Sequence, residues 1–417
     1  MLNKSNEREL AYVVKVGWVR PIEGADNIEL IGINGWTCIA KIGEFKEGDL
    51  AVYFEIDSKL PEADWSEFMA SKGYKVKTMK LNKFKVISQG LALPASTFGA
   101  VCYQDGDGTM YIHFDKNSVL HENIDLGEGE FLTKKLGVTY AVEEDNARKA
   151  NNVDKYKKMA QRRPDIFKKP FVKWLYKYNW GKKLLFVFYG KKKDTRNWPS
   201  WVVKTDEERV QNMTWILNDK SPWFATEKID GTSTTFTMKG FGKKREFYVC
   251  SRNVNFDTPE KKENGGYYDT NVYVEMANKY NVEEVLADIL DTNKKDLDFV
   301  TLQGETYGEG IQKRTYGLKG HDFAAFNLIY GYKDGRVKRF NPADMTNILT
   351  VKYSIPCVPI VEYGKILPDT VEEILSYATG ASTIDGGMRE GIVFRDELGE
   401  RSFKAVSNEF LLKYHNG

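Results

Sequence analysis

Short apolar stretches separated by turn signals fill the first third of the chain. Residues 23–26 (EGAD) and 46–49 (KEGD) are typical of these turns. Five stretches have the length and composition of β-strands: Leu10–Val16, Ile28–Ile33, Trp36–Ile42, Leu50–Ile56 and Met110–Phe114. Many short strands at close spacing favour a small β-barrel, which we expect over residues 1–145.

The pattern changes after residue 200, where strand-like runs alternate with helical ones. Helical periodicity is clearest over Val272–Tyr280 and Val282–Leu290. This order predicts an α+β domain over residues 200–417. Residues 146–199 then remain as a connector between the barrel and this domain.

The connector is strongly basic, although the whole chain has a formal net charge of only +2. Between Arg148 and Arg196 there are 17 Lys and Arg residues against three acidic residues, with ten aromatic residues among them. Cations beside flat rings suit a nucleic acid, whose phosphates they neutralise and whose bases stack. Two other interpretations fit the same pattern: helices whose rings pack while the lysines stay solvated, and an anionic membrane surface.

The overall composition is that of a globular protein, with 41% hydrophobic and 29% charged residues. The longest apolar run, Leu184–Tyr189, is too short to span a bilayer, and the first residues lack the apolar core of a signal peptide. The four cysteines are isolated from one another and the histidines number four, which argues against a structural zinc site. We therefore expect a soluble, intracellular, cytoplasmic protein with reduced thiols and no membrane association.

Candidate chemistry begins at Lys228, in the segment 225–233 (ATEKIDGTS) between two strand-like flanks. A lysine is a poor nucleophile at its ordinary pKa of about 10.4. In a pocket with other cations the amine can become neutral and attack a phosphorus atom. The four-residue pattern KxDG is common by itself, and a solvated lysine at a strand edge is the competing interpretation.

Further elements follow this lysine in a fixed order. They are SRN at 251–253, LQGE at 302–305, FAAFN at 323–327, EGIVF at 390–394 and SFKAVSN at 402–408. In order and rough spacing this series resembles the motifs of the covalent nucleotidyltransferase superfamily, which comprises polynucleotide ligases and RNA capping enzymes. The resemblance covers about 200 residues and implies a C-terminal adenylyltransferase domain of the ligase and capping type.

Two features narrow the resemblance. The first is a similarity to OB-type barrels of tRNA-binding and RNA-ligase accessory modules, carried by residues 24–36 and 45–61 (GADNIELIGINGW and FKEGDLAVYFEIDSKLP). The second is that only 13 residues follow Lys404, which are too few for a C-terminal OB domain. The chain therefore resembles ATP-dependent RNA ligases with an N-terminal OB domain, which serves as a nucleic-acid-binding accessory domain. Residues 204–212 (KTDEERVQN) also resemble that branch; alternatively they begin a helix capped by Thr205 and Glu208.

The resemblance implies a reaction in three steps, which repairs broken RNA. Lys228 attacks the α-phosphate of ATP and forms a lysyl-AMP; the AMP then passes to an RNA 5′-phosphate; finally an RNA 3′-hydroxyl attacks that phosphate and AMP leaves. Lys404 is expected to contact the α-phosphate and to lower the pKa of Lys228. We expect the enzyme to act as a monomer.

The resemblance also implies roles for the other site residues. Asp230, Glu305 and Glu390 would hold Mg²⁺ or Mn²⁺ through their carboxylate oxygens, with Glu305 also close to the nucleotide. Phe326 would stack on the adenine, and Glu227 would accept a hydrogen bond from the adenine amino group. Arg252 would contact the nucleotide or the RNA 5′-phosphate.

One position departs from the family pattern. Many RNA ligases have two lysines spaced KxK in the last element, whereas Val406 stands here in the second place. Lys313, Arg314 or Lys404 alone must then suffice. The alternatives to an RNA ligase are a DNA or mixed-duplex ligase, a guanylyltransferase of the same superfamily, and a non-catalytic RNA-binding protein.

Overall fold

The computed structural model describes residues 8–141, 164–178, 180–182, 184–185, 198–204, 206–257, 259–264 and 270–414. The chain divides into two compact units. The larger unit combines Met1–Val138 with Asn197–Gly417, and the smaller one is Thr139–Arg196.

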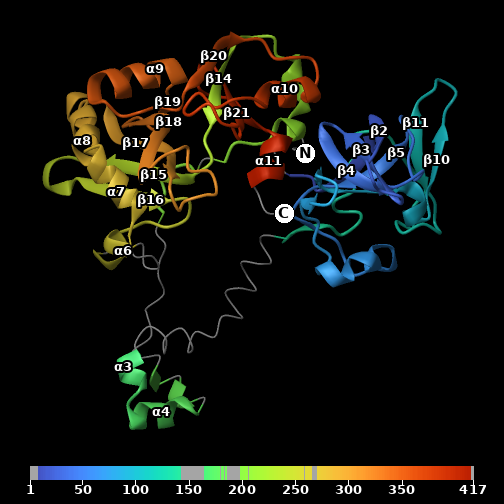
Figure 1. The fold of residues 1–417 in the computed structure, drawn as a ribbon, viewed down its shortest axis with the longest axis horizontal. Helices are drawn as coiled ribbons and strands as arrows, with labels where there is room; N and C mark the ends of the chain where they lie inside the picture. The colour runs from blue at the N-terminus through green and yellow to red at the C-terminus, as the bar shows by residue number, and fades with distance from the viewer. Residues whose placement is uncertain are drawn as a thin grey trace. The chain divides into compact units, whose positions relative to one another are not determined.

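The first part of the larger unit is built from short antiparallel strands, and all five strands expected from the sequence are present (Figure 1). They pair in the orders β1-β5-β9, β2-β3-β4, β10-β11-β12 and β7-β8. Alternate side chains such as Val14, Ile31 and Tyr53 fill the interior. The elements are β1 (Ala11–Lys15), β2 (Trp18–Pro21), β3 (Ile28–Ile33), β4 (Trp36–Lys41), β5 (Leu50–Phe54), β6 (Ser58–Lys59), η1 (Asp64–Lys72), β7 (Met79–Leu81), β8 (Val86–Ser88), β9 (Leu91–Pro94), η2 (Ala95–Phe98), β10 (Val101–Gln104), β11 (Met110–Phe114) and β12 (Ile124–Leu126).

The second part of the larger unit contains a five-stranded antiparallel sheet. Its strand order is β16-β15-β17-β18-β19, and helices α7 and α8 lie beside it (Figure 1). Both helices coincide with periodic stretches of the sequence, and Asn271 caps the first turn of α7. The elements are β15 (Thr232–Lys239), η5 (Gly242–Lys244), β16 (Glu246–Ser251), α6 (Pro259–Asn264), α7 (Val272–Lys279), α8 (Val282–Thr292), β17 (Leu297–Gly308), β18 (His321–Tyr332), β19 (Val337–Arg339), α9 (Pro342–Thr346) and the π-helical turn η6 (Asn347–Lys352).

A second antiparallel sheet of four strands completes this domain, in the order β20-β14-β21-β22. Its core is formed by large apolar side chains, among them Trp223, Phe394 and Phe403, packed against α10 and the turns before β14. The elements are η3 (Val210–Asn212), η4 (Thr214–Asn218), β14 (Trp223–Lys228), β20 (Ile360–Lys365), α10 (Val371–Ala378), β21 (Gly391–Asp396), β22 (Ser402–Val406) and α11 (Asn408–Tyr414). The α+β prediction for this half is confirmed.

Among the described residues of the smaller unit are β13 (Thr139–Tyr140) and the short helices α3 (Pro164–Phe167) and α4 (Pro170–Tyr176). Much of the predicted basic connector lies outside the described residues. Within the part of the chain that the structure describes, no helix has the length and apolar character needed to cross a bilayer.

The alternative interpretation of residues 204–212 as a capped helix is wrong. Thr205 lies outside the described residues, but residues 206–208 are not helical, and a turn of 3₁₀-helix begins only at Val210. The segment runs along β22 instead: the Lys404 amide donates to the Glu208 carbonyl at 2.7 Å. This contact brings the segment to the candidate site.

Candidate active site

Lys228 lies where the two sheets of the C-terminal domain meet. It is the last residue of β14, opposite Gly391 of β21, and three residues connect it to the start of β15. The connection is tight: a Cβ added to Gly231 would lie 2.3 Å from the Thr306 carbonyl oxygen. Only glycine fits this close approach of two backbones, which explains the glycine of the KxDG pattern.

The Lys228 amine forms an ion pair with Glu390, and Nζ is 2.7 Å from Oε2. Burial lowers the pKa of this amine, but Glu390 and Glu305 raise it more strongly, so the pKa lies above its ordinary value. The lowering expected from Lys404 is thus outweighed, although the two lysines do interact, since Lys228 lowers the pKa of Lys404. The carboxylates around the amine determine the direction of its pKa shift.

Two further carboxylates lie close to this pair. The pKa of Glu305 is raised to about 8, mainly by burial; Lys228 lowers it, and Glu390 and Asp230 add to the increase. Asp230 is buried, and its backbone amide donates to the Tyr316 hydroxyl at 2.7 Å. Three carboxyl groups, those of Glu390, Glu305 and Asp230, therefore surround the Lys228 amine.

Lys404 and Arg252 approach the site from other strands and share one counter-ion. The Asp206 carboxylate accepts from Lys404 Nζ at 3.2 Å and from Arg252 Nη2 at 2.6 Å. Burial lowers the pKa of Lys404, Asp206 opposes this effect, and Lys228 adds to it. Nothing in the sequence marks Asp206 as a partner of these cations.

These groups surround a cavity of 430 Å³, within the size range of small-molecule sites. Six of the eight site residues expected from the sequence line it, and the other two, Asp230 and Glu390, are buried beside Lys228. The lining residues are Asp206, Glu207, Thr226, Glu227, Lys228, Ile229, Gly231, Thr232, Ser233, Arg252, Glu305, Gln312, Phe326, Val358, Val393, Arg395 and Lys404.

Glu227 is the most strongly held of the predicted residues. Its carboxylate accepts from Ser382 Oγ at 2.5 Å and from the amide and hydroxyl of Thr383, each at 2.7 Å. These three hydrogen bonds fix its orientation at the cavity wall. Its contact with adenine remains a prediction.

Arg395 is a lining residue that sequence reasoning missed. Its side chain is 1% exposed, and it donates to the Phe326 carbonyl at 2.6 Å and to Glu207 Oε1 at 3.1 Å. Glu207 Oε2 in turn accepts from the Ser402 hydroxyl. Arg395 thus joins β21 to the backbone of Phe326, the residue expected to stack on the base.

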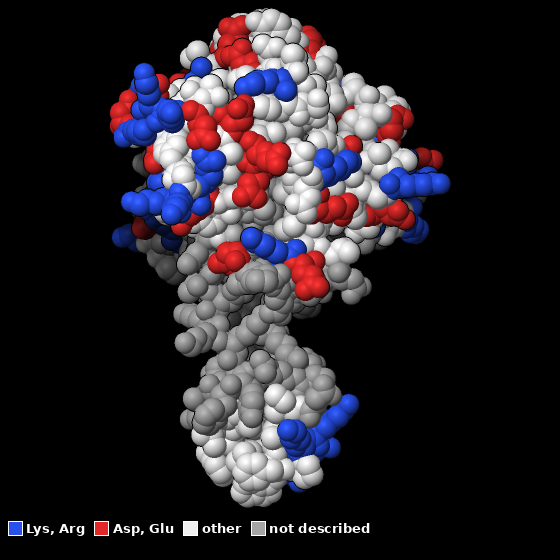
Figure 2. Space-filling model, turned by 90° about the vertical axis from the view of Figure 1, so that its left-hand side faces the viewer, with Lys and Arg blue, Asp and Glu red and all other residues white. Residues whose placement is uncertain are grey.

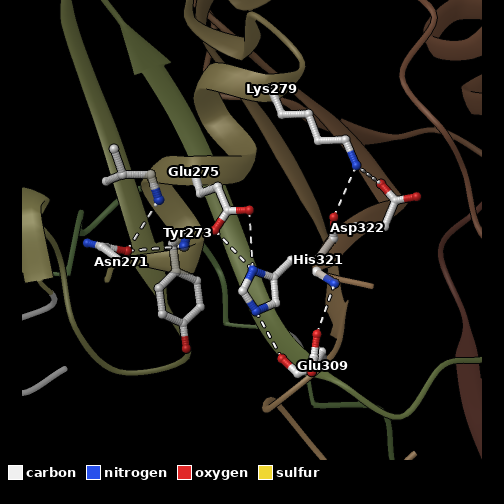
Figure 3. A network of polar contacts seen from close by, with 9 residues as sticks. Asn271, Tyr273, Glu275, Lys279, Glu309, His321 and Asp322 are labelled. Carbon is white, nitrogen blue, oxygen red and sulfur yellow. Dashed lines mark hydrogen bonds and ion pairs between the residues drawn. The ribbon is translucent and has the colours of Figure 1, made fainter. Parts of the chain in front are cut away.

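Helix α7 makes a network of polar contacts with the end of β17 and the start of β18 (Figure 3), and one further contact reaches the cavity wall. The Tyr273 and Thr232 hydroxyls are 2.9 Å apart, and Thr232 lines the cavity. Glu275 and the ring of His321 are 3.0 Å apart. Figure 3 also shows the helix cap at Asn271 and the ion pair between Lys279 and Asp322.

The departure at Val406 has a structural explanation. Val406 is buried and packs with Ile87 and Leu411, so a lysine at this position would meet an apolar cluster. The charge of Arg314 is already engaged, because its buried guanidinium forms an ion pair with Asp385 at 2.5 Å. Lys404 remains the lysine of this element that lines the cavity.

The described residues contain no ready-made group of three or more His, Cys, Asp or Glu side chains disposed to hold a metal ion. The carboxylates around Lys228 nevertheless suit a hard divalent cation as part of its ligand set. The pKa of Glu305 is raised mainly by burial and further by Glu390 and Asp230, and a bound cation would lower it again.

A lysine and several carboxylates beside a cavity between two antiparallel sheets, after an OB barrel, define a covalent nucleotidyltransferase. Residues 10–95 match the family model of an OB-fold domain, and residues 221–415 match that of RNA ligase. Over residues 221–415 the chain is therefore similar to the RNA ligase family.

Solved structures of Naegleria gruberi RNA ligase are similar over almost the whole chain. A lysine-to-alanine variant with ATP and Mn has 26% identity and a TM-score of 0.61, covering 97% of this chain and 99% of that one. The same ligase with PPi has 26% identity and a TM-score of 0.59, covering 98% and 99%. A glutamate-to-alanine variant with ATP and Mn has 27% identity and a TM-score of 0.61, covering 98% and 100%. A search of curated protein sequences finds no match.

Proposed function

We propose that this chain is an ATP-dependent RNA ligase that joins RNA 3′-hydroxyl and 5′-phosphate ends through an adenylate on Lys228. The observation that carries the proposal is the position of Lys228, at a cavity that also presents Lys404 and Arg252 and borders several carboxylates. We further propose that it acts as a cytoplasmic monomer in the repair of broken RNA.

In the first step the Lys228 nitrogen forms a bond to the α-phosphorus of ATP, and the bond to the leaving pyrophosphate breaks. The amine must lose a proton to become a nucleophile. Glu390 Oε2, 2.7 Å from Nζ, is placed to accept it. Lys404 and Arg252 are the cations that would stabilise the negative charge around phosphorus.

The adenylate then passes to RNA. An oxygen of the RNA 5′-phosphate attacks the AMP phosphorus and the bond to Lys228 breaks. Next the 3′-hydroxyl of the second RNA end attacks the activated 5′-phosphate, loses its proton and releases AMP. The same cations serve each step, because each one concentrates negative charge around a phosphorus atom.

We assign Asp230, Glu305 and Glu390 to a divalent cation, Mg²⁺ or Mn²⁺, which when bound neutralises phosphate charge and polarises phosphorus–oxygen bonds. Mn accompanies ATP in the Naegleria ligase structures. We assign Phe326 and Glu227 to the adenine, since both line the cavity.

The chain spacing of replaced residues in the Naegleria structures supports these assignments. Two of its variants replace a lysine and the aspartate two positions later, the separation of Lys228 and Asp230 here. Two others replace a glutamate and a lysine 14 positions later, the separation of Glu390 and Lys404.

Incubation with α-labelled ATP and Mg²⁺ or Mn²⁺, followed by a denaturing gel, tests the first step. We expect label to remain on the wild type and on the control Lys239→Ala, a lysine of β15 outside the cavity, and to be absent from Lys228→Ala. Labelling by GTP alone would indicate a guanylyltransferase. A folded, adenylate-free protein that takes no label from either nucleotide would refute the proposal.

Sealing assays then identify the substrate. The proposal expects joining of RNA ends that carry 3′-hydroxyl and 5′-phosphate groups, and loss of joining in Lys228→Ala. Adenylylation with joining of nicked DNA but not of RNA would assign the chain to DNA or mixed-duplex ligases instead.

A further inference from the structure

The smaller unit exposes a group of aromatic rings that its own packing does not use. Phe171, Trp174, Tyr178 and Trp180 have exposed fractions of 68%, 48%, 44% and 57%. The apolar core of this unit is formed by other residues, Val172, Leu175 and Leu185, with Ile166, Phe167 and Tyr176 against it. Packing of aromatic rings, one of the three interpretations of the basic connector, therefore explains Phe167 and Tyr176. It does not explain these four exposed rings.

The four rings form one continuous surface, which we call the aromatic face. Phe171 and Trp174 are stacked with centroids 6.1 Å apart, and Tyr178 and Trp180 are stacked at 6.2 Å. Trp174 joins the two pairs, with edge contacts to Tyr178 at 5.5 Å and to Trp180 at 6.3 Å. Several rings are thus held together while their outer faces remain open to solvent.

Lysines border this face. At about 100° per residue, Lys173 and Lys177 of the α4 region lie next to Phe171, Trp174 and Tyr178 on the side away from the buried residues. All charged side chains that the structure describes in this unit beyond residue 141 are lysines: Lys168, Lys169, Lys173, Lys177 and Lys182. Figure 2 likewise shows blue but no red side chains on the visible described surface of this unit.

We propose that the aromatic face and its lysines bind single-stranded RNA, as a second contact for the RNA that the active site joins. Open rings provide stacking surfaces for bases of any sequence, and neighbouring cations follow the phosphates. Among the described side chains of this unit, Leu184 is the one large aliphatic group that is exposed, so the face offers flat rings rather than chains suited to a lipid interior. The choice of RNA over other polyanions rests on the proposed function.

Binding of a short, fluorescently labelled single-stranded RNA to the full-length chain tests the aromatic face. We expect the double variant Trp174→Ala with Trp180→Ala to weaken binding by roughly tenfold or more, because each stacked base contributes substantially. Trp174→Phe with Trp180→Phe keeps two rings and should retain most of the affinity. Trp215→Ala, which removes an exposed tryptophan of the other unit, should leave affinity unchanged.

The salt dependence of binding tests the lysines. Replacing Lys173 and Lys177 by Gln should reduce the slope of log affinity against log salt by about 1.4, if each lysine neutralises one phosphate of a single strand. Lys243→Gln with Lys244→Gln removes the same charge from η5, outside the aromatic face, and should leave the slope unchanged.

Each variant is also incubated with α-labelled ATP. This second assay distinguishes a failure of the proposed ligase function from a failure of the proposed RNA binding by the aromatic face. Unchanged label with weakened RNA binding supports the aromatic face even if the RNA ends are never joined. Wild-type RNA affinity in the Trp→Ala variant would overturn the proposal. Binding to anionic phospholipid vesicles that the Trp→Ala variant loses, while RNA binding persists, would overturn it in favour of a membrane contact.

Discussion

The carboxyl group of Glu305 offers a quantitative test of the electrostatics of the site, because its pKa in the folded chain is raised to about 8. Burial is the main cause, and Glu390 and Asp230 add to it. An unfolded glutamate titrates near pH 4.3, so between about pH 4.3 and about 8 the folded chain retains a proton that the unfolded chain has released. Stability contributed by this proton is fully present below about pH 4.3 and is lost as the pH rises through 8.

The size of this loss follows from the two pKa values. From about pH 6 to about pH 8 the linkage relation gives a decrease of at most about 2 kcal/mol in the free energy of unfolding. Glutamine does not titrate, so Glu305→Gln should lack this decrease. For a domain of about 200 residues, the melting temperature of the variant relative to wild type should therefore rise by up to about 4–8 °C over this range.

Thermal unfolding of the metal-free protein, followed by near-ultraviolet circular dichroism at several pH values with a chelator present, measures this difference. The control is Glu283→Gln, which replaces a glutamate exposed on α8. A difference between Glu305→Gln and wild type that stays constant from about pH 6 to about 8 would show that the buried carboxyl does not hold this proton.

Three further changes test the contacts around the cavity. Gly231→Ala should destabilise the domain by about 1–3 kcal/mol and abolish adenylylation, since the added carbon meets backbone, whereas Gly106→Ala, with open space around it, should leave both melting and labelling unchanged. Arg395→Gln should cost about 1.5–3 kcal/mol in chemical unfolding, because the partly buried Glu207 carboxylate and the Phe326 carbonyl lose a charged hydrogen-bond partner. Arg336→Gln, which removes an exposed pair, should cost less than about 1 kcal/mol. Asp206→Asn frees two cations and should lower the ATP concentration that half-saturates adenylylation by up to about fivefold; an increase would contradict its role as their counter-ion.

The order of motifs was sufficient to predict which side chains converge. Lys228, Glu305, Phe326 and Lys404 come from four strands, and all four line one cavity. The residues were chosen by their resemblance to a motif series, and the pairing of β14 with β21 and of β15 with β17 brings the elements that carry them together.

The protonation of Lys228 could not be predicted in the same way. Both signs of charge were expected near its amine, and their relative distances decide the direction of the pKa shift. The structure places Glu390 at 2.7 Å, within contact distance, whereas the sequence shows only that Glu390 and Lys404 are both far away along the chain. A separation of 162 residues carries no information about a contact distance.

Arg395 illustrates a second limit. An arginine at the end of an apolar strand is ordinarily exposed, and the residues that make its burial possible lie in other elements, the Phe326 carbonyl on β18 and Glu207 ahead of η3. Its partners also include a backbone group, which has no sequence signature. A buried polar network of this kind depends on how the strands pack together, and so it can be identified only in the folded structure.

The alternation along β22 explains why the family pattern can lose its second lysine here. Phe403 and Ala405 point into the core of the four-stranded sheet, so Lys404 and Val406 share the opposite face. That face changes character within one step: Lys404 contacts Asp206 at the cavity, while Val406 contacts Ile87. A lysine at the second position would lose its hydration in that apolar cluster, so the position that supplies a cation in many RNA ligases serves here to pack the chain.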